Sequence, residues 1–265
     1  MSGGCKLAQG LASGVAVRGA QALRPQSEAV IAQMAQAPEP AQAAAMDQMI
    51  AALISAEVWG RLDALFVMAA GDEQAAGVNW AQPLVGCLSP INSPVFTPWS
   101  GYEGDGATSF LETGFLQGSG LYQAADHHAG VWAVAGQSVG CAFGNSRNRI
   151  HPRNSSGQVT TRSNCTTNRQ VGIPSGLGHT MMSRRTTDSY LVLKDGALLS
   201  EPVEAITAVA AQRLILHGYA ASGTEGALSS WRLAAAHFGA GLTAEQGAAL
   251  HSALGRYLAE VGSWG

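Results

Sequence analysis

Short apolar runs separated by Gly, Asn and Ser dominate the stretch from residue 128 to residue 200. The last two runs enclose Asp195-Gly196, a pair that favours a type I′ turn because such a turn needs positive φ at both central residues. Several short strands at this spacing predict an antiparallel sandwich. Turn-rich residues 84–126 and two later apolar runs add strands, so we expect a β-sandwich over residues 81–237.

A period of three to four residues marks the chain before the sandwich, over residues 41–70. The apolar side chains there recur as one buried helix face requires; they are Met46, Met49, Ile50, Leu53, Ile54, Leu62, Leu65, Phe66 and Ala69. Glu57 to Gly60 interrupts this period. We therefore predict two helices joined at Gly60, which form a helical mount over residues 41–80.

The two ends of the chain differ from each other. Thr243 and Gln246 make a capping-box pattern that opens an amphipathic segment, so we expect a C-terminal helix within residues 238–265 that packs back on the sandwich or the mount. Residues 1 to about 24, which open the segment 1–40, carry too little apolar surface to build a core of their own. For residues 1–40 we predict an extended attachment segment, with a short helix from Pro25.

Bulk composition narrows the classes of partner. The 265 residues carry a formal net charge of −3, and nucleic-acid binding, which needs a clustered basic face, is not expected. No apolar run approaches the length of a membrane span. The N-terminal residues lack the continuous apolar run of a signal peptide, so a cleaved signal is not expected. The four cysteines lack metal-ligand spacing, and free thiols are expected, although a disulfide between Cys141 and Cys165 stays open.

Two clusters invite a search for catalytic chemistry. Retaining glycosidases need two carboxylates facing one cleft, and Glu103 and Asp105 are two residues apart, but among glycines that indicate a turn. Asp126-His127-His128 lacks the further ligands that a metal needs. Nucleophile, phosphate-binding and dinucleotide motifs are missing. We therefore predict no enzyme, no cofactor and no metal.

Saccharide binding uses other side chains, because a sugar presents hydroxyl groups and an apolar ring face. Polar loops between residues 145 and 154 supply amide and guanidinium donors, with Arg162 and Asn164 on the strand that follows, and aromatic residues near residue 100 supply platforms. Trp132 lies in an apolar strand and is expected in the core. The candidate glycan-binding residues are Trp99, Tyr102, Asn145, Arg147, Arg149, Arg153 and Asn154.

Several segments in order resemble a group of virion proteins of tailed phages, prophages and gene transfer agents. These segments span residue 41 to the end; they are Gly60–Ala70, Asn79-Trp80, Asn92–Thr97, Gly101–Phe115, His128–Trp132, Ile150–Asn154 and Gly239–Thr243. The globular part of that group is a concanavalin A-like jelly roll. The resemblance therefore implies a mainly β fold of this kind with flanking α-helices at both ends.

The same resemblance implies a function. It suggests a head-spike or tail-fibre component that is made in the bacterial cytoplasm, resides in the virion and binds a host surface polysaccharide. Residues 1–40 would contact other virion proteins, and a homo-oligomer is expected. Two alternatives stay open. One is a purely structural connector or decoration protein without glycan binding, and the other is a polysaccharide depolymerase.

Overall fold

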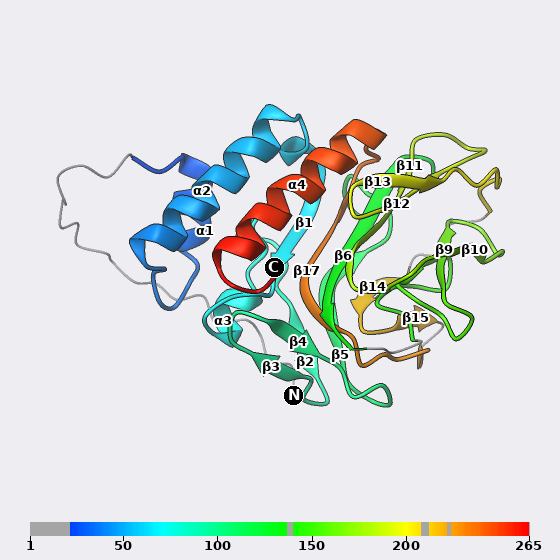
Figure 1. Cartoon of the computed structure of the whole chain (residues 1–265), viewed down its shortest axis with the longest axis horizontal. Helices are drawn as coiled ribbons and strands as arrows, with labels where there is room; N and C mark the ends of the chain where they lie inside the picture. The colour runs from blue at the N-terminus through cyan, green and yellow to red at the C-terminus, as the bar shows by residue number, and fades with distance from the viewer. Residues whose placement is uncertain (1–21, 137–139, 208–211, 222–223, 265) are drawn as a thin grey trace.

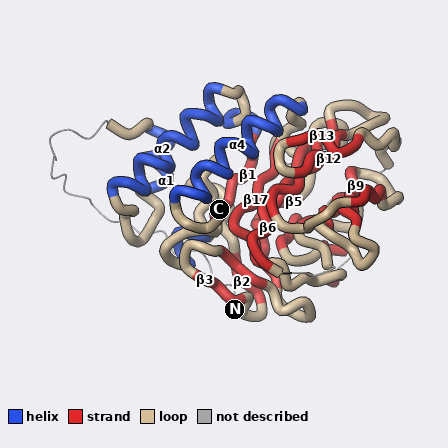
Figure 2. Tube along the Cα trace, viewed as in Figure 1, coloured by secondary structure: helices blue, strands red, loops and turns tan. Residues whose placement is uncertain are grey.

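The computed structural model describes residues 22–136, 140–207, 212–221 and 224–264. In these residues the chain forms three layers, in which two antiparallel β-sheets pack face to face and helices cover the outer face of one sheet (Figures 1 and 2). The prediction of a mainly β, jelly-roll-type sandwich with helices from both ends of the chain is confirmed.

The helix-covered sheet, here the first sheet, is built around β17. In spatial order it contains β13 (Ala197–Ser200), β12 (Leu191–Lys194), β11 (Gly178–Arg184), β6 (His127–Ala135), β17 (Arg232–Gly239), β4 (Gly101–Glu103) and β3 (Val95–Thr97), with β1 (Leu62–Val67) also paired to β17. The second sheet contains β10 (Arg169–Gly172), β9 (Gln158–Ser163), β8 (Asn148–His151), β7 (Phe143–Gly144), β14 (Arg213–Leu216), β5 (Phe110–Leu116) and β2 (Ser89–Ile91). β15 (Tyr219–Ala221) and β16 (Thr224–Gly226) form a separate hairpin.

Three helices make the outer layer, and a fourth lies at the sandwich edge. α1 (Pro25–Ile31) packs on α2 (Pro40–Ser55), which packs on α4 (Ala244–Glu260), and α4 also contacts β12 and β13. The short helix α3 (Glu73–Ala76) lies beside β4 in Figure 1. The predicted capping box is present, because Gln246 N donates to Thr243 Oγ1 and Thr243 N donates to Gln246 Oε1.

Strand β1 shows why the first sheet has apolar residues on both faces. Ala64 and Phe66 point into the core between the sheets, whereas Leu65 and Val67 join the core under the helices. All six residues of β1 are buried. Apart from Asp63 this strand is apolar, as a strand buried on both sides tends to be, so its period cannot be told from that of a buried helix.

The predicted second helix of the mount is therefore wrong. Residues 62–67 form β1, which pairs antiparallel with β17, and only residues 40–55 of the expected mount make a long helix. A one-turn 3₁₀ helix, η1 (Trp59–Arg61), separates the two elements close to the predicted break at Gly60. The pairing partner lies about 170 residues further along the chain, and the local pattern contains no sign of it.

The Asp195-Gly196 turn forms as predicted. Both residues have positive φ, 50° and 78°, and they join β12 to β13. Cys141 and Cys165 are separate buried thiols and not a disulfide. Among the described residues no helix is long and apolar enough to cross a membrane.

The expected attachment segment is only partly described, since residues 1–21 lie outside the described residues. Residues 22–40 are fixed to the body of the protein and include α1, as the predicted helix from Pro25 requires. The buried carboxylate of Asp47 on α2 accepts hydrogen bonds from Ser27 Oγ at 2.7 Å and from Arg24 N at 2.8 Å. The pKa of Asp47 is lowered although burial opposes this, because these two hydrogen bonds and the Arg24 charge favour the carboxylate.

Buried histidines are a second feature of the core. His179 Nε2 and His237 Nε2 lie 2.8 Å apart, so one ring donates the proton that the other accepts. Space for these rings comes from Gly130 on β6, where a Cβ would lie 2.4 Å from His237 Nε2. Burial lowers the pKa of both rings well below the ordinary value. The charges of His251 and Lys194 lower the pKa of His179 further, and the charge of His179 does the same for His237.

We predict that the protein loses stability as pH falls from about 7 to about 4. Burial lowers the folded-state pKa to about 3 for His127 and His217 and to about 4 for His128. Below the unfolded value of about 6.5, the unfolded chain binds protons that the folded chain excludes, so the free energy of unfolding falls. The loss at pH 5 should be on the order of 1–2 kcal/mol per buried histidine, measurable by urea unfolding across this range.

His217→Asn is the matched control for this prediction. His217 has φ of 63°, a conformation that Asn tolerates better than most residues, and Asn does not titrate. Between pH 7 and 4, unfolding of the variant should take up about one proton fewer than unfolding of the wild type, so its free energy of unfolding should fall less steeply. Stability that stays constant between pH 7 and 5 in the wild-type protein would contradict the account.

Candidate functional site

The turn between β3 and β4 carries an unusual tryptophan. Ser100 N donates to Thr97 O at 3.0 Å, which makes residues 97–100 a β-turn with Pro98 and Trp99 at its centre. Trp99 has φ of 58°, the left-handed value that the third position of a type II turn requires and that glycine usually supplies. Holding a bulky side chain there costs on the order of 1 kcal/mol, and such strain is concentrated at functional sites.

Contacts with the loop after β1 hold Trp99 in this conformation. Its backbone N–H donates to Ala70 O at 2.8 Å. The indole lies on Gly71, where an added Cβ would be 3.0 Å from Trp99 Cζ2. The ring therefore has a defined position while remaining half exposed.

Trp99 lines a cavity of about 320 Å³ between this turn and the N-terminal helices. We call it the Trp99 cavity. The remaining walls come from the loop before α2, from α2 itself, from the residues before α3 and from the helix-side core; they are Met34, Gln36, Ala37, Pro38, Glu39, Gln42, Met46, Ala70, Gly71, Asp72, Ala75, Trp80 and Tyr257. Its volume lies in the range of small-molecule sites.

The Trp99 cavity combines aromatic faces with polar groups. Trp80 and Tyr257 meet edge to face, with ring centroids 5.3 Å apart, and Trp80 Nε1 is buried without an acceptor among the described residues. Asp72 Oδ1 caps the N-terminus of α3, because it accepts a hydrogen bond from Ala75 N at 2.9 Å. Within the described chain its Oδ2 and the indole Nε1–H of Trp99 have no hydrogen-bond partner. Acceptors and donors are therefore present beside an aromatic platform.

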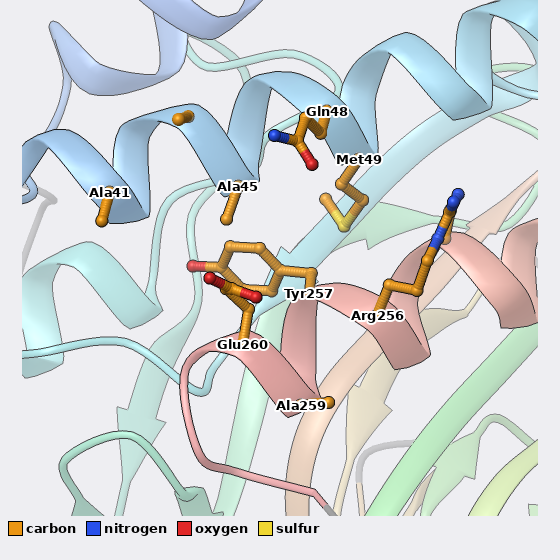
Figure 3. A pocket seen from close by; sticks show the side chains of 10 residues that line it. Ala41, Ala45, Gln48, Met49, Arg256, Tyr257, Ala259 and Glu260 are labelled. Carbon is orange, nitrogen blue, oxygen red and sulfur yellow. The ribbon is translucent and has the colours of Figure 1, made fainter.

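A second hollow, here the helix groove, lies between α2 and α4 and has a volume of about 750 Å³ (Figure 3). Tyr257 lies between the two helices with its hydroxyl toward α2, and it lines both hollows. The α2 wall consists largely of alanines, with Gln48 and Met49 beyond them. Because Tyr257 is buried and no other aromatic residue lines the groove, it offers less for a sugar ring than the Trp99 cavity does.

The predicted platform residues separate in the structure. Trp99 is half exposed and lines the Trp99 cavity, but Tyr102 on β4 is only 2% exposed and packs against Phe96. Burial raises the pKa of Tyr102, and the negative charges of Glu73 and Asp72 raise it further. Tyr102 therefore presents no face to solvent.

The predicted amide Asn145 is buried in a network of side-chain amides. Asn145 Nδ2 donates to Gln117 Oε1 at 2.9 Å, and Asn148 Nδ2 bonds the same oxygen. Asn145 Oδ1 accepts the backbone N–H groups of Arg147 and Asn148, both at 2.9 Å. The structure thus removes Asn145 from the candidate surface and makes it the group that shapes the turn carrying Arg147. Asn164 belongs to the same buried network.

The remaining predicted residues lie on the second sheet, away from Trp99. Arg147 and Arg149 are half exposed on the β7–β8 turn and on β8. Asn154 holds its own turn, since Oδ1 accepts from Ser156 N and Gln158 N. Arg153 is half exposed in the same loop. The seven predicted residues therefore belong to separate places and not to one site.

The clusters considered for catalysis are also engaged in structural contacts. Glu103 forms an ion pair with Arg232 at 2.5 Å. Asp105 caps the following turn through three backbone N–H groups, which together with Thr108 Oγ1 hold its pKa far below the ordinary value. His127 Nε2 bonds Ser163 Oγ at 2.8 Å. Trp132 is buried as expected, and its indole stacks with the rings of His179 and His251, which also stack with each other.

Most of the residues around Trp99 were missed by sequence reasoning. Asp72 stands at a helix N-cap and Trp80 follows Asn79 in a short segment of mixed polarity, and each pattern has an ordinary structural explanation. The cavity joins residues 34–46, 70–80, 99 and 257, which only the folded chain brings together. One signal was available, because Pro98-Trp99 between two short strands places tryptophan in a tight turn.

No family model and no curated protein sequence matches the chain. Solved structures do match. A Trypanosoma rangeli sialidase mutant displaying trans-sialidase activity is 10% identical with a TM-score of 0.51, and the match covers 80% of this chain and 39% of that one. Domain 4 of an extracellular arabinanase from Geobacillus stearothermophilus, in complex with arabinotriose, is 13% identical with a TM-score of 0.44, covering 72% and 98%. The botulinum neurotoxin serotype D binding domain is 7% identical with a TM-score of 0.47, covering 73% and 52%.

At these identities the likeness to the sialidase shows a shared fold. The chain spans about two fifths of the sialidase and half of the toxin binding domain. The activities of those proteins are therefore not assigned to this chain. The prediction that the chain is no enzyme is nevertheless contradicted, because this fold occurs in a sialidase. That prediction relied on missing motifs, among them a strand-borne pair of carboxylates, and such a pair characterises only some glycosidases.

Replacing Trp99 tests the strain in the turn. Glycine adopts φ of 58° freely, whereas alanine keeps the strain and lacks the indole. Trp99→Gly should therefore be more stable than Trp99→Ala by about 1 kcal/mol. Urea unfolding of the two variants measures this difference, and equal stabilities would contradict a strained Trp99.

Proposed function

We propose that the protein binds saccharide in the Trp99 cavity. The observation that carries this proposal is Trp99 itself, a half-exposed indole held against its backbone preference beside a cavity of small-molecule size. A tryptophan that is needed only for packing has no reason to occupy a glycine position. An indole face suits the apolar face of a sugar ring, and aromatic side chains supply large contact areas at low cost in conformational entropy.

The polar atoms around Trp99 support the same proposal. Trp80 Nε1–H lacks an acceptor, and a buried donor without a partner is costly. A sugar hydroxyl is both donor and acceptor, so it can accept from such an N–H group and donate to a carboxylate such as Asp72. Glu39 and Gln42 add further polar groups along the rim. This combination of one platform and several planar polar groups favours a neutral sugar ring over an apolar ligand.

The biological setting belongs to the same proposal. The sequence resemblance supports a virion protein of a tailed phage or gene transfer agent, made in the cytoplasm of a bacterium and exposed on the particle as a spike or fibre component. In that setting the ligand is a host surface polysaccharide, residues 1–40 contact other virion proteins, and the working form is a homo-oligomer. Immunogold labelling of purified particles tests this setting independently of sugar binding.

One observation favours the alternative of a connector or decoration protein. Leu84 and Val85 are adjacent and expose 76% and 51% of their surface, in a loop next to the helical layer. Exposed apolar neighbours are typical of subunit contacts. Particles produced without this protein distinguish the two functions. Loss of particle assembly would indicate a connector, whereas loss of adsorption to the host alone would indicate a receptor-binding component.

Trp99 variants test the binding proposal directly. The full chain should bind members of a panel of bacterial surface glycans, with affinity measured by calorimetry. Trp99→Gly should weaken binding at least about tenfold, because stacking on the indole contributes roughly 1 kcal/mol or more. Trp99→Phe should retain part of the affinity because it keeps an aromatic face.

Trp59→Ala is the matched control, since Trp59 is also half buried but lies outside the Trp99 cavity. It should bind as the wild type does. A binding glycan whose affinity is equal in Trp99→Gly and in wild type would overturn the site. Assaying the bound polysaccharide for released reducing ends distinguishes binding alone from hydrolysis.

A further inference from the structure

Three arginines lie together on the outer face of the second sheet; they are Arg147, Arg149 and Arg162, here called the arginine cluster. Arg149 on β8 and Arg162 on β9 are direct partners in the antiparallel register. The next pair in that register, Ile150 and Thr161, is buried between the sheets. Since side chains alternate along a strand, both arginines point to the outer face.

This pairing is unfavourable without a counter-charge. Like charges directly opposite on neighbouring strands destabilise a sheet. Other arginines have carboxylate partners, such as Arg169 with Glu204 and Arg213 with Glu112. Within the described residues no member of the arginine cluster has one, and the segments outside that description contain no Asp or Glu.

Neighbouring groups nevertheless hold the arginines in place. The Arg149 guanidinium lies over the Tyr219 ring, 3.4 Å from its centroid. Arg162 Nη1 donates to Ser146 O at 2.9 Å, and Arg162 Nε donates to Asn168 Oδ1 at 3.1 Å. The pKa of Arg162 is lowered, first by burial and then by the charges of Arg149 and Arg147. Fixed cations with remaining free N–H groups make a preorganised anion site.

We propose that the arginine cluster, supported by Tyr219, binds the carboxylate groups of an acidic polysaccharide. A planar carboxylate can accept two parallel N–H donors from a guanidinium, and one such group between Arg149 and Arg162 removes their repulsion. The cluster has three cations in a chain of net charge −3, which suits spaced acid groups better than the dense phosphates of nucleic acid. This inference extends the proposed saccharide binding to an acidic class, but it rests on different residues.

The arginine cluster and the Trp99 cavity lie on different sides of the molecule. α2 and α4, which border the Trp99 cavity, lie on one side of the sandwich in Figure 1, whereas β9, β10 and β15 lie on the other. The two sites are therefore separable by mutation. A long polysaccharide could contact both only by passing around the sandwich.

Oligogalacturonate, a chain of uronic acid units, is a suitable probe, and its methyl ester is the matched neutral ligand. The full chain should bind the acid form and not the ester in calorimetry at low ionic strength, and added salt should weaken the binding. Arg149→Gln combined with Arg162→Gln should weaken it at least tenfold. Thermal unfolding should show that this double variant is folded, with a midpoint equal to or above that of the wild type without ligand.

Arg185→Gln combined with Arg256→Gln is the control, because both residues are exposed outside the arginine cluster and the change in net charge is identical. Equal losses in the two double variants would overturn the proposal, as would tighter binding of a DNA oligonucleotide through the same arginines. Trp99→Gly should leave oligogalacturonate binding unchanged. If neutral glycans fail to bind while the arginine dependence holds, the Trp99 proposal fails and this inference stands.

Discussion

The first sheet is buried on both faces, and the rest of the structure depends on that constraint. β17 lies at its centre and pairs with β1, β4 and β6, so residues from both ends of the chain enter one sheet. One face packs against the second sheet and the other against α2 and α4. Because apolar burial is the main stabilising contribution, the helical layer is part of the core and not an appendage.

The position of the Trp99 cavity follows from this arrangement. β1 ends at Val67, and the loop after it supplies Ala70, whose carbonyl holds Trp99, and Gly71, on which the indole lies. α2 packs on the same sheet and brings Gln42 and Met46 to the opposite wall. The cavity is thus a junction between the helical layer and the sandwich edge. The arginine cluster belongs to the other sheet, where the helices do not reach.

The sequence predicted the fold well where its patterns are local. The Asp195-Gly196 turn and the Thr243 capping box each need only neighbouring residues, and both form as expected. β1 was taken for a helix because a strand buried on two faces has no polar alternation. The sites were predicted less well. Trp99 was predicted as an aromatic platform for a sugar, but Asn145 was assigned to the surface because an amide in a polar loop looks the same whether it faces water or a buried network.

The tryptophan side chains allow the central claim, saccharide binding in the Trp99 cavity, to be measured without a variant. The chain has six tryptophans, whose indole N–H groups give separate signals in a ¹⁵N-correlated NMR spectrum. Titration with a glycan that binds should shift the Trp99 and Trp80 signals and leave the buried Trp132 and Trp231 unchanged. Saturable binding that leaves the Trp99 and Trp80 signals in place would contradict the account.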